Sequence, residues 1–275
     1  MGADIKRLKN RIRSVSSTMH ITKAMELVAS SKMKKAGMTL DAGRPYTRAI
    51  DDVFGRLAGC KSVFTGARGE KRVLCILIAG DRGLAGGYNN DVFKLLAEFA
   101  AGKDVTLIPI GKRACDHAAK RGFETRGMFS SVENFRMEDS VSLGKAITDS
   151  FSAGEFDAVY TIYTRHISIL TREPSAEKIL PIEKKDDAAP PADILFEPSM
   201  EAVLDAAMPE YVSGRIYGQA CESFSAELAA RRTAMDSATK NASGIIDDLS
   251  LKYNRARQGA ITQEITEIIG GAEAQ

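Results

Sequence analysis

A long, proline-free periodic pattern at the start of the chain is the feature that most constrains its fold. No proline occurs from residue 4 up to Pro45, and apolar or small residues recur in alternating steps of three and four. This 3.5-residue period is typical of a coiled-coil seam and predicts one helix over residues 1–57. The seam positions are Ile5, Leu8, Ile12, Val15, Met19, Thr22, Ala29, Met33, Ala36 and Leu40, with Glu26 as a polar interruption.

A helix of this kind needs a partner. About 50 helical residues span roughly 75 Å at 1.5 Å per residue, whereas globular helices average about 11–12 residues. A single helix of that length cannot bury its own seam, so a second apolar helix has to lie along it.

The end of the chain supplies a matching pattern. No proline follows Pro209 up to residue 269, and Gly270-Gly271 predicts where the helix stops. We predict a C-terminal helix within residues 209–275 that pairs antiparallel with residues 1–57, although pairing with a second chain is the alternative. Its seam is Cys221, Phe224, Leu228, Met235, Ala238, Ala242, Ile245, Leu249, Ala256 and Ala260, with Arg231 and Lys252 also in phase.

The tip of this second helix is more apolar than a free helix end requires. Residues 261–269 include four isoleucines among threonines and glutamates. Two interpretations follow from the pattern: the tip docks onto the chain's own first helix, or it inserts into an apolar sleeve on a partner.

Charge is distributed unevenly along the chain. The formal net charge is only +2, yet residues 1–35 hold nine Lys or Arg against Asp4 and Glu26, a local charge of +7. Such a segment is either a solvated helix face or a surface that seeks an acidic partner or an anion. An aromatic content of 7% and the absence of Trp favour long helices over a β-sandwich.

The middle of the chain, residues 70–195, predicts a Rossmann-like open α/β domain. An apolar run at 73–79 is typical of a strand covered on both faces, and strands alternate with helices after it, which favours a mostly parallel sheet. The expected elements are strands 73–79, 104–110 and 156–164, helices 90–101, 112–121 and 138–153, a hairpin partner at 167–170, and an exposed loop at 184–192.

The glycine-dense loop at residues 80–89 invites comparison with phosphate-binding loops, but its details differ. The glycines do not form GxGxxG, and Gly102-Lys103, Gly111-Lys112 and Gly144-Lys145 lack the Ser or Thr of a P-loop. We expect a tight turn in which the glycines allow positive φ and close packing against a helix, and no bound nucleotide or other cofactor.

Other chemical motifs are sparse. His20, His117 and His166 lie in separate segments, and the four cysteines are scattered without CxxC spacing, so we expect reduced thiols, no metal site and no catalytic residues. No apolar run is long enough to span a bilayer and no secretory signal is visible.

Three separated motifs carry a resemblance to a known family. Residues 21–33 (ITKAMELVASSKM) closely resemble the first helix of the gamma subunits of F-type ATP synthases. Residues 81–89 (DRGLAGGYN) resemble that family's central-domain loop, and residues 253–268 (YNRARQGAITQEITEI) its C-terminal signature. The motifs stand in the family's order and cover nearly the whole chain.

The resemblance implies a rotor that performs no bond chemistry itself. In this family the terminal helices form a coiled-coil shaft inside a head of alpha and beta subunits. The central domain lies near the epsilon subunit and the membrane c-ring. Ion flow, of protons or sodium, turns the shaft. With no transit peptide before the first motif, we expect a bacterial peripheral protein on the cytoplasmic face of the plasma membrane, bound to no nucleic acid and not inserted into the bilayer.

The resemblance also implies contact residues. The family's contacts with the catalytic head match Met25, Arg231, Gln258, Thr262 and Glu264. An Arg at a seam position is poorly explained by packing and better explained as a contact that reaches a partner. A weaker match places the contact with the membrane ring at Leu195, Phe196 and Glu197.

Two other functions fit parts of the sequence. A nucleic-acid-binding protein would use the basic paired helices, but it lacks the interleaved aromatic residues or recognised module that such surfaces carry. A small α/β enzyme with helical arms would need a competent pocket in the central domain.

Overall fold

The computed structural model describes residues 2–66, 68–169, 171–183 and 196–273. These residues divide into two compact units. The paired-helix unit joins Met1–Ser30 to Arg231–Gln275, and the central unit is Ser31–Ala230. Helices α1 (Gly2–Leu57) and α5 (Met200–Glu273) each contribute to both units.

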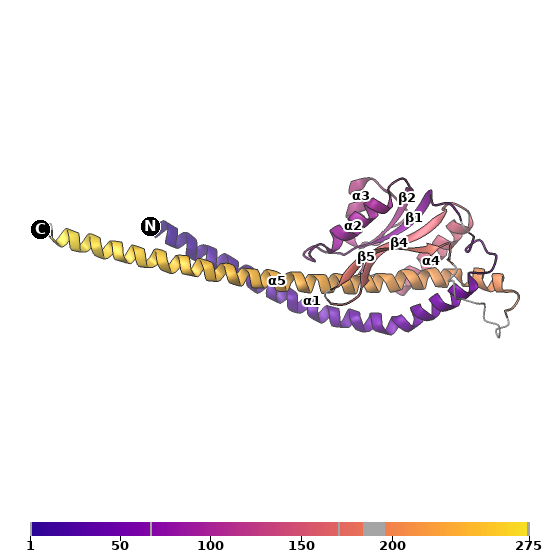
Figure 1. The fold of residues 1–275 in the computed structure, drawn as a ribbon, viewed down its shortest axis with the longest axis horizontal. Coiled ribbons are helices and arrows are strands. Elements are labelled where there is room, and N and C mark those ends of the chain that lie inside the picture. The colour runs from indigo at the N-terminus through magenta and orange to yellow at the C-terminus, as the bar shows by residue number, and fades with distance from the viewer. Residues whose placement is uncertain (1, 67, 170, 184–195, 274–275) are drawn as a thin grey trace. The chain divides into compact units, whose positions relative to one another are not determined.

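In the paired-helix unit the two helical segments lie side by side and run in opposite directions (Figure 1). The hydroxyls of Thr22 and Thr239 are hydrogen-bonded across the pair at 2.8 Å. Every position of the predicted N-terminal seam from Ile5 to Leu40 is buried or half-buried, whereas most of the residues between them are exposed. The 3.5-residue period therefore identified the covered face of α1.

The covered face of α5 differs from the predicted seam beyond Ala242. Ile245 is 47% exposed, while its neighbour Ile246 is half-buried. Lys252 is exposed in the same way and Tyr253 takes the covered position. The observed face continues in steps of four and three through Leu249, Tyr253, Ala256 and Ala260. The predicted positions Leu249, Ala256 and Ala260 are therefore confirmed, whereas Ile245 and Lys252 were wrong by one residue each. Because residues 245 and 246 are both isoleucine, the sequence does not distinguish between them.

The central unit contains a five-stranded sheet in the order β3-β2-β1-β4-β5. The strands are β1 (Arg72–Ile78), β2 (Asp104–Ile110), β3 (Glu124–Thr125), β4 (Ala158–His166) and β5 (Arg172–Leu180). All neighbouring pairs are parallel except β4 and β5, which are antiparallel. This confirms the mostly parallel open sheet.

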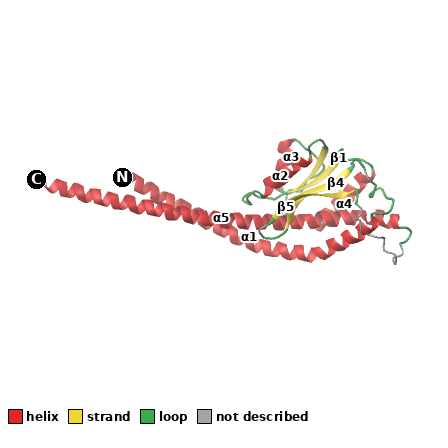
Figure 2. Cartoon of the chain, viewed as in Figure 1, coloured by secondary structure: helices red, strands yellow, loops and turns green. Residues whose placement is uncertain are grey.

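Helices cover both faces of this sheet (Figure 2). Alternate residues of β1 point to opposite sides, so Leu74 and Ile76 pack with α4 (Met137–Ser152), α5 and the end of α1. Cys75 and Leu77 pack with α2 (Tyr88–Phe99) and α3 (Lys112–Arg121). This double cover explains why the strand is apolar without alternation.

Two elements differ from the sequence-based prediction. Residues 167–169 belong to the turn between β4 and β5, in which Ser168 N–H donates to the Thr171 carbonyl at 2.9 Å, and the hairpin partner is β5. This strand pairs only with β4 and is rich in charged residues, with Pro174 tolerated because β5 is an edge strand. The predicted loop at 184–192 lies outside the described residues.

Helix α5 begins at Met200, so Pro209 lies inside it rather than before it. A proline lacks the backbone N–H of a regular helix, but Leu204, Met208 and Val212 around it are fully buried in the core. Packing of this turn against the sheet explains why the helix continues. At the other end α5 extends to Glu273, past the predicted stop at Gly270-Gly271.

Gly144 shows how closely two helices of the central unit approach. A Cβ atom placed on this residue of α4 would lie 2.2 Å from the Ser213 hydroxyl oxygen and 2.7 Å from the backbone oxygen of Pro209. No side chain fits there, so this glycine is required by packing and not by phosphate binding.

Candidate functional site

The apolar tip of α5 is exposed in the structure. All residues from 261 to 269 are exposed, and the side chains of Ile261, Ile265, Ile268 and Ile269 are 49–66% accessible. The C-terminal end of α5 extends beyond the N-terminal end of α1 (Figure 1). Docking of the tip onto the chain's own first helix is therefore wrong, and four isoleucines present an uncovered surface.

Three of the predicted contact residues lie at or next to this tip. Gln258, Thr262 and Glu264 are all exposed. The Thr262 hydroxyl donates to the backbone carbonyl of Gln258 at 3.0 Å, so its side chain is held against the helix. Glu264 lies about 120° around the helix from Gln258, given 100° per residue. Thr262 is only about 40° from Gln258, so the three residues lie within about 160° of the helix circumference. Glu264 can therefore meet a different neighbour from the other two.

Met25 and Arg231 form a second group. The antiparallel register set by Thr22 and Thr239 puts the two residues within about two helical turns of each other. Along α5, Arg231 is roughly 50 Å from Glu264. The structure therefore separates the five predicted contact residues into two groups.

The surroundings of these two residues differ. Met25 is 36% exposed and belongs to an apolar strip with Ile21 and Val28, which are 58% and 57% exposed. Arg231 is half-buried and interacts within the chain. The strip is an open surface for a partner, whereas Arg231 combines an internal contact with partial access to solvent.

The basic residues of the first 30 positions form exposed faces. Lys6, Lys9, Arg11 and Arg13 are all exposed. Among the described residues of this segment the ion pairs are local, such as Lys23 with Glu26 at 3.0 Å. These positive charges are available to an acidic surface.

The residues predicted to contact the membrane ring differ in their exposure to solvent. Leu195 lies outside the described residues. Phe196 is half-buried against the core of the central unit, and Glu197 is exposed. Of the two residues that the structure describes, Glu197 presents its side chain to solvent and Phe196 packs inward.

The glycine loop has the conformation expected of a tight turn. Gly86 has a φ of +59°, and Leu84 has +63°, an unusual value for a non-glycine residue. The Asn89 side chain accepts the Gly80 N–H at 2.9 Å, so this amide is already bonded within the chain. A Cβ on Gly80 would lie 2.6 Å from the carboxyl group of Glu227 on α5, which confirms the predicted close packing against a helix.

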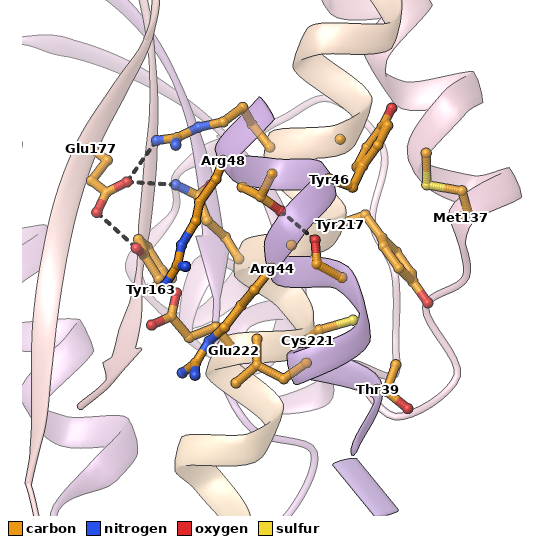
Figure 3. A pocket seen from close by; sticks show the side chains of 17 residues that line it. Thr39, Arg44, Tyr46, Arg48, Met137, Tyr163, Glu177, Tyr217, Cys221 and Glu222 are labelled. Carbon is orange, nitrogen blue, oxygen red and sulfur yellow. Dashed lines mark hydrogen bonds and ion pairs between the residues drawn. The ribbon is translucent and has the colours of Figure 1, made fainter. Parts of the chain in front are cut away.

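The sequence patterns did not reveal a half-buried charge network around Glu177 in the central unit, part of which is drawn in Figure 3. The Glu177 carboxylate on β5 accepts hydrogen bonds from Tyr163 at 2.7 Å, Arg165 at 2.5 Å, Arg215 at 2.8 Å and Gln219 at 2.9 Å. The four donors come from β4 and α5, and no local spacing in the sequence joins those elements.

Electrostatics explain the ionised state of Glu177. Burial alone would raise its pKa, but the hydrogen bonds from Arg165 and Tyr163 outweigh that effect and hold the pKa below its ordinary value. The same burial, with the Glu177 charge nearby, raises the pKa of Tyr163. Glu177 therefore acts as a charged anchor between the sheet and α5.

The cysteines and histidines do not form a chemical site in the part of the chain that the structure describes. All four cysteines are free, and Cys75 is fully buried, with its pKa raised by burial. His20 is exposed on its helix, as expected, and the ring of His117 stacks on Phe93 at 4.0 Å. Over the same residues, no His, Cys, Asp and Glu side chains cluster as a metal ion would require.

None of the described helices is both long and apolar enough to span a bilayer.

The chain is similar in sequence to one set of known proteins. The family described as ATP synthase matches residues 4–275. A protein of Ruminococcus albus named ATP synthase gamma chain is 42% identical over 276 residues, covering 97% of this chain and 96% of its own. One from Acetobacterium woodii, named ATP synthase gamma chain, sodium ion specific, is 38% identical and covers 100% and 99%.

Solved structures share the fold. A chain of the Euglena gracilis mitochondrial ATP synthase, in an assembly of OSCP, F1 and c-ring, matches with a TM-score of 0.75 at 18% identity, covering 100% of this chain and 95% of that one. A chain of the rotor of the same organism's enzyme matches with a TM-score of 0.69 at 18% identity, covering 95% and 100%.

Proposed function

Since the chain belongs to the ATP synthase gamma-chain family, we propose that it is the central-stalk rotor subunit of an F-type ATP synthase. It carries the rotation of an ion-driven membrane ring into the catalytic head and so couples proton or sodium flow to ATP synthesis or hydrolysis. The chain itself binds no nucleotide and catalyses no reaction. The observation that carries this proposal is the uncovered isoleucine tip of α5.

The shaft is an antiparallel coiled coil of the chain's own two ends. The covered faces of α1 and α5 both follow steps of three and four, and the hydrogen bond from Thr22 to Thr239 joins them. Small residues such as Ala29 and Ala242 are buried on these faces and allow close approach of the helices. We divide the chain functionally into shaft helices at 1–57 and 209–275 and a Rossmann-like domain at 70–195.

The tip fits an apolar sleeve in a head of alpha and beta subunits. Ile261, Ile265 and Ile268 would each lose exposed surface there, which is favourable by about 25 cal/mol per Å². The threonines and glutamates between them would keep the contact from becoming a permanent, wholly apolar one.

Rotation has to change the catalytic sites through unequal contacts. Moving one site from 1:99 to 99:1 needs roughly 5.5 kcal/mol of differential binding, and equal contact on all sides shifts nothing. Gln258, Thr262 and Glu264 lie within about 160° of the helix circumference near the tip, while Met25 and Arg231 act farther along the shaft. A lopsided shaft of this kind presents a different face to each catalytic subunit.

The central domain provides the other partners. We assign to it the contacts with the epsilon subunit and the membrane c-ring, with Glu197 and its neighbours Leu195 and Phe196 at the ring. The protein would be peripheral, on the cytoplasmic face of a bacterial plasma membrane. Neither the nucleic-acid-binding function nor the separate enzyme gains support from the relatives.

Co-purification followed by a rotation assay tests the proposal. The tagged chain should bring down alpha and beta subunits with ATPase activity, and a bead attached to the central domain should turn when ATP is added but not without it. A complex that hydrolyses ATP while the bead stays still would contradict the rotor function, as would failure to recover any head complex.

A matched pair of variants tests the sleeve. Replacing Ile261, Ile265, Ile268 and Ile269 together by Ser should reduce the yield of head complex severalfold, because the tip then loses its apolar surface. Ile245→Ser removes an isoleucine that is equally exposed but far from the tip, and should leave the yield unchanged. Equal yields from both variants would exclude insertion of the tip.

A further inference from the structure

The middle of α1, residues 41–53, is attached to the rest of the central unit by few side chains. The structure describes every residue of this middle span, and none of them is buried. Only Thr47, Ile50 and Asp51 are half-buried, whereas Phe54, which follows, is part of the core. A cavity of about 400 Å³ lies between the span, the facing turns of α5 and strands β4 and β5 (Figure 3). Apolar packing therefore contributes little to holding the middle span in place.

The surface of α5 that faces the middle span is smooth. A Cβ atom on Gly214 would lie 3.1 Å from the side chains of Tyr46 and Ile50. A Cβ atom on Gly218 would lie 3.2 Å from the Thr47 hydroxyl oxygen. Packed helices fix their relative position by inserting side chains of one helix between side chains of the other. Two glycines four residues apart offer no side chain for this purpose, so this contact alone does not fix α1 on α5.

Arg215, which follows the first of these glycines, connects three elements. Its Nη1 donates to the Asp51 carboxylate on α1 at 2.7 Å, and its Nη2 donates to the Glu177 carboxylate on β5 at 2.8 Å. Glu177 in turn accepts hydrogen bonds from Tyr163 and Arg165 on β4. The guanidinium group is planar and rigid, so one side chain fixes the separation between the carboxylates of α1 and β5.

Burial and geometry distinguish this bridge from the other ion pairs of the middle span. The Arg215 side chain is only 16% exposed, so salt screens its two ion pairs less than it screens surface pairs. The ion pairs of Arg44 with Asp41 and of Arg56 with Asp52 are more exposed and join α1 only to itself. Arg215 therefore supplies a directional connection from the middle span to α5 and the sheet.

Given the rotor function proposed above, we propose that Arg215 is a positioning residue for rotation. It fixes the middle of α1 to α5 and the sheet, so that both helices, and not α5 alone, turn with the central domain. The core holds α1 again only from Phe54 onward. Without the bridge, the middle span could shift over the smooth surface of α5 whenever the shaft is twisted.

Hydrogen exchange in the full-length chain tests the bridge itself. Arg215→Met removes both ion pairs and keeps an apolar side chain of similar length, while Glu177 retains its other three donors. Amides of residues 46–53 should exchange about tenfold faster in this variant, because two charge-assisted hydrogen bonds that oppose local opening are lost. Arg56→Met removes an ion pair that lies within α1 and should leave these amides unchanged.

A rotation assay on the assembled complex tests the role in transmission. The head is fixed to a surface, and the angle of a bead on the central domain is recorded during the pauses between steps. The variance of this angle should be about twofold larger with Arg215→Met, because one helix instead of two of equal diameter then carries the twist over these turns. Arg56→Met should match the wild type. If Arg215→Met does not assemble, Arg215→Lys decides, because one ammonium group cannot reproduce the planar fork, and it should also enlarge the variance.

The two measurements separate failure of the bridge from failure of the rotor function. A wild-type bead that does not turn would overturn the rotor function itself. Unchanged exchange at residues 46–53 in Arg215→Met would overturn the bridge. Equal angular variance for the wild type and the Arg215 variant, in complexes that rotate, would overturn its role in transmission, as would an equal increase with Arg56→Met.

Discussion

The two units of this chain bury their side chains in different ways. In the central unit, residues from both sheet faces and four helices are fully buried, including Ile76, Leu77, Ile147 and Val212. In the paired-helix unit, burial is confined to a narrow line of small or medium side chains such as Ala29, Met235, Ala242 and Leu249. A thick core buries apolar side chains on every side, while a thin helix pair leaves most of its own surface exposed.

The difference extends to the polar groups. The central unit pairs its half-buried charges internally, as the four donors to Glu177 show. The paired-helix unit keeps its charges and many apolar side chains at the surface, including the isoleucines of the tip. The central unit thus holds its charges within the fold, whereas the paired-helix unit presents charged and apolar side chains at its surface.

The comparison predicts that the largest stability losses come from the central unit. Gly144→Ala should lower the free energy of unfolding by about 3 kcal/mol, because the added Cβ collides with Ser213 and the Pro209 carbonyl. Gly244→Ala, in the paired-helix unit, meets open space and should raise it by up to about 1 kcal/mol. Urea denaturation measures both, and similar losses from the two variants would contradict the contrast.

Removing the half-buried carboxylate of Glu177 should lower the free energy of unfolding somewhat less. Glu177→Gln should lower the free energy of unfolding by about 2 kcal/mol at pH 7, because the bonds from Arg165 and Arg215 lose their charged acceptor. The folded-state pKa of Glu177 is lower than the unfolded one, so its contribution is present above the unfolded pKa and is lost as the pH falls through the folded pKa.

Denaturation at a series of acidic pH values checks that the stabilisation by Glu177 is lost as the pH falls. The wild-type chain should lose more stability than Glu177→Gln below about pH 4.5. Parallel pH profiles for the two proteins would show that Glu177 does not carry this acid sensitivity.

The third prediction concerns the function of the paired-helix unit. Arg231→Ala should lower coupled ATP turnover about tenfold, or about 1.4 kcal/mol of transition-state stabilisation, while assembly of the complex changes little. Lys252→Ala removes an exposed charge away from the covered face and is the control. Normal turnover in an assembled Arg231→Ala complex would refute a contact role for this residue.

The smallest predicted effect tests which of the two isoleucines, Ile245 or Ile246, lies on the covered face of α5. Ile246→Ala should cost about 1 kcal/mol of unfolding free energy, because its half-buried side chain lies on the covered face. Ile245→Ala should cost less than about 0.5 kcal/mol, because that side chain is 47% exposed. The reverse order, measured by thermal unfolding, would restore the phase that the sequence alone had favoured.

Local patterns in the sequence predicted much of this fold. Strand β2 at Asp104–Ile110 and helix α3 at Lys112–Arg121 have the predicted bounds, because an apolar run and a glycine on each side of the helix define them locally. The edge strand β5 was missed, since its pairing with β4 and not its own polar sequence makes it a strand. The predicted contact residues at the head and ring remain predictions, although the exposure of those within the described residues is now known.

The sequence by itself determined the family, through its three separated motifs. It also determined the long helices at both ends and the alternating sheet, because periodic side chains report which faces of an element are covered. Only the tertiary structure decided that Pro209 lies within α5, that Ile246 and not Ile245 is covered, and that Glu177 meets Arg215. Those outcomes depend on groups brought together from distant segments. Their energies come from packing and charge pairing across space, and no spacing along the chain records them.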